Sequence, residues 1–334
     1  MVVVGGGPAG AVTAQQLATR GMQVVVVEAA ARPRWKPGEV LAPNCVFALR
    51  ALGLLDALSN REMASPCLGV RRTWVTPTPR LHDYLVERGG LGFVVDRAAF
   101  ESHLVERASV AGAKWMWNTR FTAVNREIGK WRLSLRHTVS GAASTQLARF
   151  MIDATGRSAS VARALGGRRI RGSRRVAVCR VRRERDALAP GWVDVKAHPN
   201  GWTYTALGPR VRSDVLVTNR QAIDVERLRG ATLCDASYAR IDCCAGPGWL
   251  AVGDAAASFD PIASQGLPHA LSSGMAAAWA TLDWMARPKA GTLDHYAAAT
   301  ARTWQSSLRG SLAVYRGQPR WGGTPFWAAA REAR

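Results

Sequence analysis

The chain has 334 residues, and 48% of them are hydrophobic. A chain of this length and composition buries a large core without disulfides or structural metal, which excludes disorder and a minimal scaffold. Its 45 lysines and arginines outnumber 24 aspartates and glutamates, giving a formal net charge of +21.

No segment is predicted to span a membrane, because the longest apolar stretch, residues 275–285, contains Asp283 and is too short to cross a bilayer. Residues 1–4 run into glycines without the basic flank or cleavage region of a secretory signal, so we expect a cytoplasmic protein. The six cysteines form no CxxC pair and no Cys/His grouping at metal-ligand spacing. We therefore expect reduced thiols and no metal site.

Residues 2–28 predict a strand, a helix and a second strand, with a G-x-G-x-x-G pattern in the first turn. In this pattern the glycines permit a tight turn, close approach of the backbone to a pyrophosphate, and close packing of the helix. The helix N-terminus then faces the phosphates. The predicted dinucleotide contacts of this turn are Gly5, Gly7, Pro8, Ala9 and Gly10.

An acidic residue, Glu28, follows the second strand at the spacing expected for a ribose-binding carboxylate. A carboxylate accepts hydrogen bonds from the adenosine ribose hydroxyls and disfavours a 2′-phosphate. The unit therefore favours FAD or NAD over NADP as the bound dinucleotide.

Three further motifs follow along the chain. Residues 35–39 read Trp-Lys-Pro-Gly-Glu, in which Lys36 is interpreted as an exposed, solubilising lysine. Residues 96–101 predict a helix start with Asp96 as its N-cap. After a β excursion over residues 121–139, a strand at 150–152 leads into Asp-Ala-Thr-Gly-Arg.

Ten arginines fall between Arg163 and Arg185, and only Glu184 and Asp186 oppose them in this stretch. One interpretation is a docking face for an acidic partner, and the favoured one is a solvated surface. No nucleic-acid motif or aromatic interleaving accompanies the run, so nucleic acid is not expected as a partner.

Residues 200–209 predict an alternating strand on which Trp202 and Tyr204 share one face. Downstream, an apolar strand at 249–252 delivers Gly253-Asp254, followed by Asp260-Pro261 and then by Gln265-Gly266-Leu267 at the start of a helix.

Taken together, these motifs resemble the FAD-dependent monooxygenases of the p-hydroxybenzoate hydroxylase fold and their relatives, the flavin halogenases and geranylgeranyl-reductase-like proteins. The strand at 200–209 is similar to that of tryptophan-halogenase-like flavoproteins and tryptophylquinone maturases, but lacks the W-x-W-x-I-P motif of tryptophan halogenases. The resemblance implies an α/β fold: a Rossmann-like FAD-binding domain of the glutathione-reductase type with an inserted β-sheet substrate domain.

By this resemblance, Asp254 binds the ribityl chain, and the helix that starts at Gly266 points its N-terminus at the flavin, where its dipole stabilises negative charge. The implied cofactor contacts beyond the first turn and Glu28 are Glu39, Arg97, Val124, Asp153, Gly156, Gly253, Asp254, Pro261, Gln265, Gly266 and Leu267.

The resemblance also implies a domain organisation. We expect a discontinuous FAD-binding domain at 1–70, 96–165 and 235–300, a substrate domain at 71–95 and 166–234, and a short helical C-terminal cap at 301–334. The segment 219–233 is short for the family, so part of the substrate lid is expected to be absent.

The expected activity is that of a monooxygenase in which a flavin C4a-hydroperoxide hydroxylates an aromatic substrate or a peptide-borne aromatic side chain. Trp202, Tyr204 and Trp74 are the candidate substrate contacts, although aromatic core packing explains them as well. His269 and Tyr204 are the candidate catalytic residues, and an ordinary helix histidine is the alternative for His269. The substrate is expected to be a small aromatic molecule or a peptide- or carrier-bound group.

The resemblance leaves the electron source open between NAD(P)H and a separate flavin reductase, with O2 as co-substrate. Alternative functions are a two-component flavin-dependent halogenase, a geranylgeranyl-reductase-like enzyme, or a truncated, non-catalytic flavoprotein that binds an acidic partner.

Overall fold

Mostly buried valines form two neighbouring strands of the central sheet in the region expected to bind FAD. The computed structural model describes residues 1–88, 90–183, 191–223, 228–289 and 291–332. The strands run in the order β19-β20-β11-β1-β2-β7, and all neighbours are parallel except β19 and β20. Their bounds are β1 (Val2–Val4), β2 (Val25–Val27), β7 (Lys114–Met116), β11 (Met151–Asp153), β19 (Ala245–Gly246) and β20 (Trp249–Ala251).

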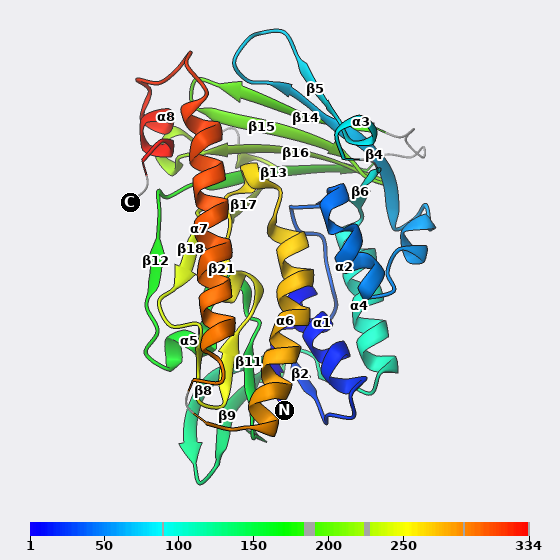
Figure 1. Ribbon diagram of the computed structural model, residues 1–334, viewed down its shortest axis with the longest axis vertical. Helices are drawn as coiled ribbons and strands as arrows, with labels where there is room; N and C mark the ends of the chain where they lie inside the picture. The colour runs from blue at the N-terminus through cyan, green and yellow to red at the C-terminus, as the bar shows by residue number, and fades with distance from the viewer. Residues whose placement is uncertain (89, 184–190, 224–227, 290, 333–334) are drawn as a thin grey trace.

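Alternate residues of β1 pack against two different layers, as the pleat of a strand requires. Val3 packs among helices α1 (Pro8–Ala18) and α6 (Gly266–Ala286), whereas Val2 and Val4 pack on the opposite side. Helix α4 (Arg97–Val110) lies beside α1 in the helical layer (Figure 1). Both faces of the parallel sheet are therefore covered.

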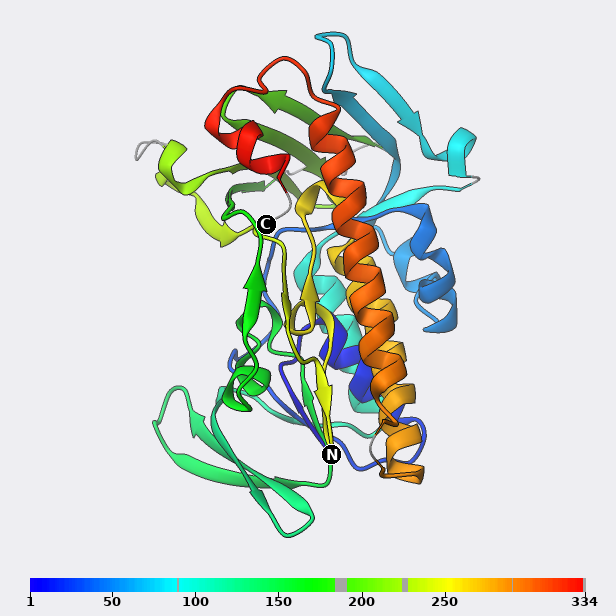
Figure 2. The same ribbon diagram turned by 60° about the vertical axis from the view of Figure 1, so that its left-hand side comes forward.

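A three-stranded antiparallel meander covers the second face, and Figure 2 shows it at the end of the molecule away from the large sheet. It contains β8 (Thr119–Glu127), β9 (Lys130–His137) and β10 (Ala143–Ala148). Its first turn contains Gly129 at φ +69°. The expected β excursion is confirmed, and it continues into a third strand.

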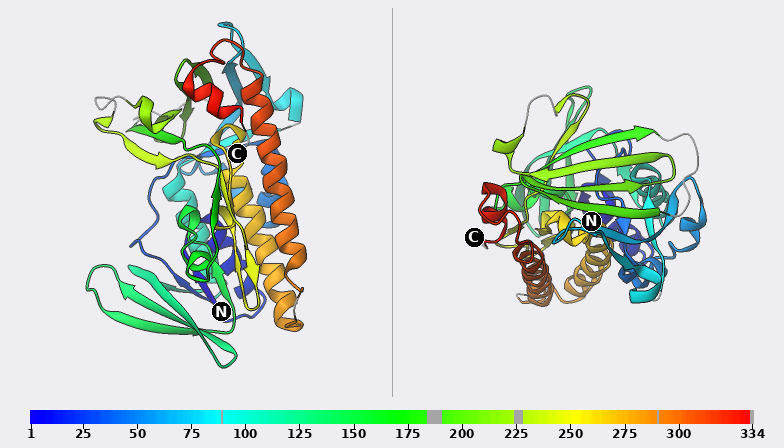
Figure 3. Two further views of the ribbon diagram at one scale, coloured as in Figure 1. Left: turned by 90° about the vertical axis from the view of Figure 1, so that its left-hand side faces the viewer. Right: turned by 90° about the horizontal axis from the view of Figure 1, so that it is seen from above.

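The upper half of the molecule is a mostly antiparallel sheet, in which only β4 and β14 are parallel neighbours (Figures 1 and 3). Its order is β17-β13-β16-β15-β14-β4-β6-β3, with β5 paired to β4. The bounds are β3 (Val40–Leu41), β4 (Ala64–Thr73), β5 (Arg80–Asp83), β6 (Gly92–Val95), β13 (Val176–Arg183), β14 (Gly191–His198), β15 (Gly201–Leu207), β16 (Val211–Thr218) and β17 (Thr232–Asp235).

The sheet takes in more of the chain than the expected substrate domain. Strand β3 and the first residues of β4 belong to it, although the sequence-based boundaries assign residues 1–70 to the FAD-binding domain. Conversely, β12 (Arg169–Arg171) pairs outside it, in a small sheet with β18 (Ala239–Ile241) and β21 (Ala257–Ser258).

The C-terminal segment is a long helix rather than a short cap. Helix α7 (Asp294–Arg316) begins before residue 301, runs alongside α6 and reaches the large sheet, where α8 (Pro325–Ala330) follows it (Figure 1). The remaining helices are α2 (Val46–Ala51), α3 (Tyr84–Arg88) and α5 (Ser160–Ala164). Among the described helices, none has both the length and the apolar character needed to cross a bilayer.

Close packing of α6 on α1 gives a test of this fold. At Gly274 a Cβ would lie 2.9 Å from the Ala9 carbonyl oxygen and from the Val12 Cβ, so Gly274→Ala should lower the free energy of unfolding by about 1–3 kcal/mol. The matched control is Gly310→Ala on exposed α7, where nothing lies within 4 Å and helix propensity should add about 0.5–1 kcal/mol. Urea denaturation of both variants measures the difference. Equal changes in the free energy of unfolding for the two variants would contradict the close packing of α6 on α1.

Candidate functional site

A cavity of about 900 Å³ lies between the carboxyl ends of the parallel strands and the large sheet. Its floor contains residues that follow β1, β2, β11 and β20, which is the edge where α/β sheets bind ligands. Its roof is formed by the large sheet and is mostly apolar, although β4 contributes Arg72 beside Val70 and β17 contributes Cys234. The apolar residues come mainly from β13, β14, β15 and β16. These roof residues are Ala177, Val193, Val195, Trp202, Tyr204, Val215 and Val217.

The glycine-rich turn has the conformation that its sequence predicts. Gly5 has φ +107°, and a Cβ there would lie 2.2 Å from the Ala154 carbonyl oxygen. A Cβ on Gly10 would lie 2.0 Å from the Gly5 oxygen, so both positions need glycine for close packing. Gly7 differs, because its φ is −68° and nothing lies within 4 Å of a Cβ placed there. Gly7, Pro8 and Ala9 line the cavity at the N-terminus of α1.

Glu28 lies at the rim of the same turn. One carboxylate oxygen accepts the backbone N–H of Gly6 at 2.7 Å, and the other accepts that of Ala30 at 2.8 Å. These bonds orient the carboxylate at the cavity, where it retains lone pairs for a ligand hydroxyl.

A second helix N-terminus faces the cavity at α6. Gln265, Gly266 and Leu267 line it, and a Cβ on Gly266 would meet nothing within 4 Å. The first N–H groups of a helix have no partner within the helix and carry its positive dipole end. The cavity therefore has two anion-favouring ends, one at α1 and one at α6.

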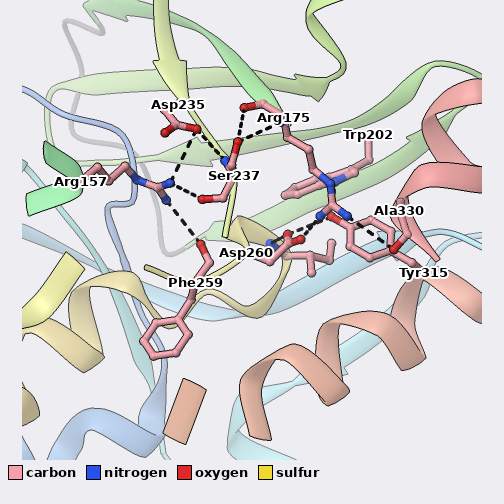
Figure 4. Close-up of polar contacts among 10 residues, drawn as sticks. Arg157, Arg175, Trp202, Asp235, Ser237, Phe259, Asp260, Tyr315 and Ala330 are labelled. Atoms are coloured by element: carbon pink, nitrogen blue, oxygen red, sulfur yellow. Dashed lines mark hydrogen bonds and ion pairs between the residues drawn. The ribbon is translucent and has the colours of Figure 1, made fainter. Parts of the chain in front are cut away.

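Asp254 and Pro261 also line the cavity. The Asp254 carboxylate is 3.3 Å from the Arg157 Nε. Arg157 also donates to the carbonyl oxygens of Ser237 and Phe259 (Figure 4). Arg157 thus joins three segments of the site. Its place directly after the Asp-Ala-Thr-Gly motif is the only sequence signal for this role.

The loop at residues 36–39 contributes the buried Glu39, which is 2% exposed. Its Oε2 accepts the Gly38 N–H at 2.6 Å and the Tyr204 hydroxyl at 3.3 Å. Its Oε1 has no partner among the described residues. Because a buried carboxylate oxygen needs a donor, this atom indicates where a ligand N–H or O–H binds.

Arg97 holds this loop in place. Its guanidinium donates to the carbonyl oxygens of Pro37 at 2.9 Å and Gly38 at 3.0 Å, and forms an ion pair with Glu101. Lys36 pairs with the same Glu101 at 3.0 Å. Lys36 is exposed, as expected, but it also lines the cavity and is anchored to a buried carboxylate.

Asp153 and Gly253 shape the site without lining the cavity. The Asp153 carboxylate accepts N–H groups of Thr155 at 3.0 Å and Ala162 at 2.8 Å, and complete burial raises its pKa. A Cβ on Gly253 would lie 2.8 Å from the Ala9 Cβ, so glycine permits close packing on α1. Gly156, which follows Asp153, lines the cavity.

Val124 is not a cavity residue. Strand β8 lines the cavity with residues 119–121, but its pairing with β9 has a bulge between Phe121 and Ala123. Beyond this bulge, Val124 packs in the core under the meander. Residues 119–121 rather than Val124 therefore line the cavity at this strand.

Trp202 and Tyr204 share the cavity face of β15, which confirms the alternation expected from the sequence. Burial, together with the negative charge of Glu39, raises the pKa of Tyr204 well above its usual range. The Tyr204 hydroxyl therefore stays protonated and donates to Glu39.

A chain of buried hydrogen bonds, here called the relay, fixes the Trp202 indole (Figure 4). The Trp202 indole N–H donates to the Tyr315 hydroxyl at 3.0 Å, which donates to Asp260 Oδ1 at 2.9 Å. Asp260 in turn forms an ion pair with Arg175, and both side chains are nearly inaccessible. Arg175 lies within the arginine run that was expected to form a solvated surface, so that expectation is wrong for this residue. Glu184 and Arg185 of the run lie outside the described residues.

Trp74 does not line the cavity. It lies just beyond β4, is 5% exposed, and donates its indole N–H to the Val314 carbonyl oxygen of α7 at 3.1 Å. Its ring packs edge-on against Trp202 and Trp327, with centroids 6.4 Å and 5.2 Å away. The expected substrate contact is therefore a core residue, placed there because α7 and α8 cover this end of the sheet.

His269 lines a second cavity, of about 490 Å³, with residues of α2 and α7. Its ring packs edge-on against Phe259 with centroids 4.5 Å apart, and its Nε2 has no partner among the described residues. Burial lowers the pKa of His269 to about 4, so the imidazole is neutral near pH 7. The structure does not bring His269 to the lining of the first cavity.

Comparison with known protein families identifies the family to which this chain belongs. The family model described as "FAD binding domain" matches residues 1–218. LodB of Marinomonas mediterranea, named as an FAD-dependent oxidoreductase, is 24% identical over 98% of this chain and 95% of its own length. The tryptophan 2-halogenase of Chondromyces crocatus is 28% identical over 83% of this chain. That match spans 60% of the halogenase.

Solved structures share the whole fold. The myxobacterial chondrochloren halogenase CndH has a TM-score of 0.87 and 23% identity, and the likeness covers all of this chain and 86% of CndH. The peptidyl tryptophan dihydroxylase QhpG has a TM-score of 0.79 and 24% identity, over 99% of this chain and 78% of QhpG.

Fold and site thus define an FAD-dependent oxidoreductase. The chain belongs to the FAD binding domain family and to the FAD-dependent monooxygenase and halogenase superfamily. The residues present fit the cofactor: Gly7 and Gly266 leave open space at two helix N-termini, and Glu39 offers an unpartnered buried oxygen. Glu28 and Asp254 are placed to accept hydroxyl hydrogen bonds.

The open space at Gly7 predicts a variant that loses the cofactor but keeps the fold. Gly7→Val should change the free energy of unfolding of the apoprotein by less than about 1 kcal/mol. It should weaken FAD binding at least about 100-fold, because the side chain occupies cavity space needed by the pyrophosphate. Flavin fluorescence titration measures the affinity, with Gly323→Val in an exposed loop as control. Unchanged FAD affinity of Gly7→Val would contradict the placement of the pyrophosphate beside Gly7.

The lowered pKa of His269 predicts an acid-sensitive stability. The unfolded chain takes up the proton at about pH 6.5, but the folded chain does so only near pH 4, so acidification through this window favours unfolding. The full shift corresponds to about 3 kcal/mol. His269→Gln should lose less stability than the native chain between pH 7 and pH 4 in urea denaturation, whereas the exposed His295→Gln should match the native chain. Parallel pH curves for all three proteins would refute this.

Proposed function

We propose that the protein is a flavin-dependent monooxygenase that hydroxylates an aromatic substrate, either a small molecule or an aromatic side chain of a peptide. The observation that carries this proposal is the apolar roof of the cavity, in which Trp202 and Tyr204 stand among valines above the flavin-binding edge. Such a wall excludes water and offers edge and face contacts to an aromatic ring.

The bound FAD would supply the oxygen-activating chemistry, with O2 as co-substrate. The chain's own residues bind the cofactor, orient the reacting groups and exclude water from the cavity. The N–H groups at the start of α6 favour negative charge on the reduced cofactor. Glu39 accepts a hydrogen bond through its free oxygen, and Tyr204 keeps its proton and fixes the other oxygen.

Between the two candidate catalytic residues, the geometry supports Tyr204. Its hydroxyl lies in the cavity beside Glu39, whereas the His269 ring lies in the second cavity. We propose Tyr204 as the residue nearest to the reacting groups and His269 as a structural residue of α6.

The named relatives support an aromatic or peptide substrate. QhpG, which shares the fold, is named as a peptidyl tryptophan dihydroxylase essential for tryptophylquinone cofactor biogenesis. An indole carried on a peptide is therefore the first substrate class to test.

A second candidate function is halogenation by a two-component system. It is favoured by the similarity to the tryptophan 2-halogenase over 83% of this chain. A reductase-like activity on an isoprenoid chain is the third candidate, supported by 32% identity to a geranylgeranyl diphosphate reductase over 48% of this chain. A non-catalytic flavoprotein that binds an acidic partner is the remaining alternative.

One experiment separates these functions. The FAD-loaded protein is mixed anaerobically with NADH or NADPH, or with a flavin reductase, and then with ¹⁸O2, bromide and a tryptophan-containing peptide. Incorporation of ¹⁸O into the peptide supports the proposal, and bromination supports the halogenase. Reduction of flavin by NAD(P)H alone identifies a self-contained enzyme. No modification of any acceptor tested, with FAD firmly bound, would favour the non-catalytic alternative.

The relay behind Trp202 predicts a change in substrate use. Tyr315→Phe removes the hydroxyl that links Trp202 to Asp260, so the indole loses its acceptor. We expect a several-fold rise in KM for the aromatic acceptor and more peroxide released per NAD(P)H, with FAD affinity unchanged. The control Tyr296→Phe removes a buried hydroxyl bonded to the Ala251 carbonyl oxygen, away from the roof. Identical kinetics for Tyr315→Phe and the native protein would contradict a positioning role.

A further inference from the structure

Two cysteines share one face of the large sheet at its edge. Cys179 lies on β13 and Cys234 on the adjacent β17. In the antiparallel register Cys234 is opposite Ala177, and Cys179 is opposite Thr232. The two side chains are therefore diagonal neighbours on the same face. That face is the cavity roof, because both Ala177 and Cys234 line the cavity.

The two thiols affect each other unequally. Interaction with the Cys179 side chain lowers the pKa of Cys234, while the Cys179 Sγ donates to the Ala177 carbonyl oxygen at 3.8 Å. The burial of Cys234 opposes the shift, and the positive charge of Arg157 adds to it. Interaction with the Cys234 side chain, together with burial and the charge of Cys234, raises the pKa of Cys179. The pair thus contains one thiol that ionises readily and one that holds its proton.

The two cysteines also differ in their exposure. Cys234 is half-buried and opens to the cavity, whereas Cys179 is 1% exposed. By contrast, burial raises the pKa of Cys45 and of Cys244 to about 11 and also raises that of Cys67. Because the thiolate is the reactive form of cysteine, Cys234 is the thiol in this cavity that a small oxidant can reach and attack.

We propose that Cys234 and Cys179 are a peroxide-reactive dithiol in the roof of the flavin cavity, with Cys234 as the reacting residue and Cys179 as the resolving residue. This inference is independent of the proposed substrate, since the oxidant is hydrogen peroxide itself.

The reaction has two steps. The Cys234 thiolate attacks hydrogen peroxide, so an S–O bond forms, the O–O bond breaks, and the leaving hydroxide takes a proton to become water. The sulfur of Cys179 then attacks the sulfenic acid, so the S–S bond forms and the S–O bond breaks. The departing hydroxide leaves as water with the Cys179 proton. In sum, two thiols and one peroxide give one disulfide and two waters.

Forming this bond requires a small movement of the two strands toward each other. Diagonal neighbours in an antiparallel pair have Cα atoms about 7–8 Å apart, and a disulfide needs roughly 4.4–6.8 Å, so the strands must move closer by about an ångström. Strand β17 has four residues and stands at the end of the strand order, paired with β13. A short edge strand makes such a shift possible.

The test uses the native full-length chain and a peptide map. Reduced protein is treated with hydrogen peroxide, blocked with a thiol alkylating agent and digested with trypsin. Arginines at 175, 180, 229 and 240 release the two cysteines on separate peptides, residues 176–180 and 230–240, while Cys243 and Cys244 fall on a third. We expect a disulfide-linked species of the first two peptides that dithiothreitol reverses. Recovery of both peptides unlinked and alkylated, with Cys243 oxidised instead, would overturn the proposal.

Variants assign the order of attack. In Cys179→Ser the sulfenic acid at Cys234 has no resolving thiol, so dimedone should label residues 230–240. In Cys234→Ser the linked species should be absent and residue 179 should stay reduced. Cys243→Ser removes the exposed thiol and is the matched control, which should form the linked species like the native chain. Absence of dimedone label in Cys179→Ser would contradict the assigned order. If a variant fails to fold, the peptide map of the native chain still tests whether Cys179 and Cys234 form a disulfide.

Discussion

The buried ion pair between Arg175 and Asp260 fixes how the two halves of the molecule meet. Arg175 precedes β13 of the large sheet, and Asp260 caps the turn that leads into α6 at the flavin end. Asp260 also accepts a hydrogen bond from the Tyr315 hydroxyl, which connects α7 to the ion pair. Removing one partner of such a pair leaves an uncompensated buried charge, at about 3–5 kcal/mol. The orientation of Trp202 depends on this contact, because Asp260 accepts the Tyr315 hydroxyl to which the Trp202 indole donates.

From this junction the site divides into a polar floor and an apolar roof. The floor positions two helix N-termini and several carboxylates around the space for a dinucleotide, and most of these groups are held by backbone hydrogen bonds. The roof offers valines and two aromatic rings. A charged cofactor and an aromatic acceptor can therefore meet in one cavity without competing for the same contacts. The thiol pair stands at the roof's edge, where an oxidant formed below would encounter it.

The sequence predicted the floor better than the roof. Glycine turns, strand ends and helix starts are local patterns, so Gly5, Glu28, Asp254 and Gly266 could be placed together from the sequence, and all four line the cavity. Trp74 and Val124 were misplaced because their surroundings depend on distant partners, α7 in one case and a bulge in β8 in the other. Arg175 looked like surface charge, since only tertiary pairing with Asp260, 85 residues away in sequence, reveals its burial. Likewise, the Cys179–Cys234 pair exists only through strand register.

We infer that the cavity binds FAD with its flavin ring under the aromatic roof. An experimental structure of the protein with FAD tests this most directly. We expect the pyrophosphate at the turn of Gly5, Gly7 and Gly10, the flavin ring at the N-terminus of α6, and Trp202 and Tyr204 above that ring. A flavin ring bound outside this cavity, or on the far side of α6 beside His269, would contradict it.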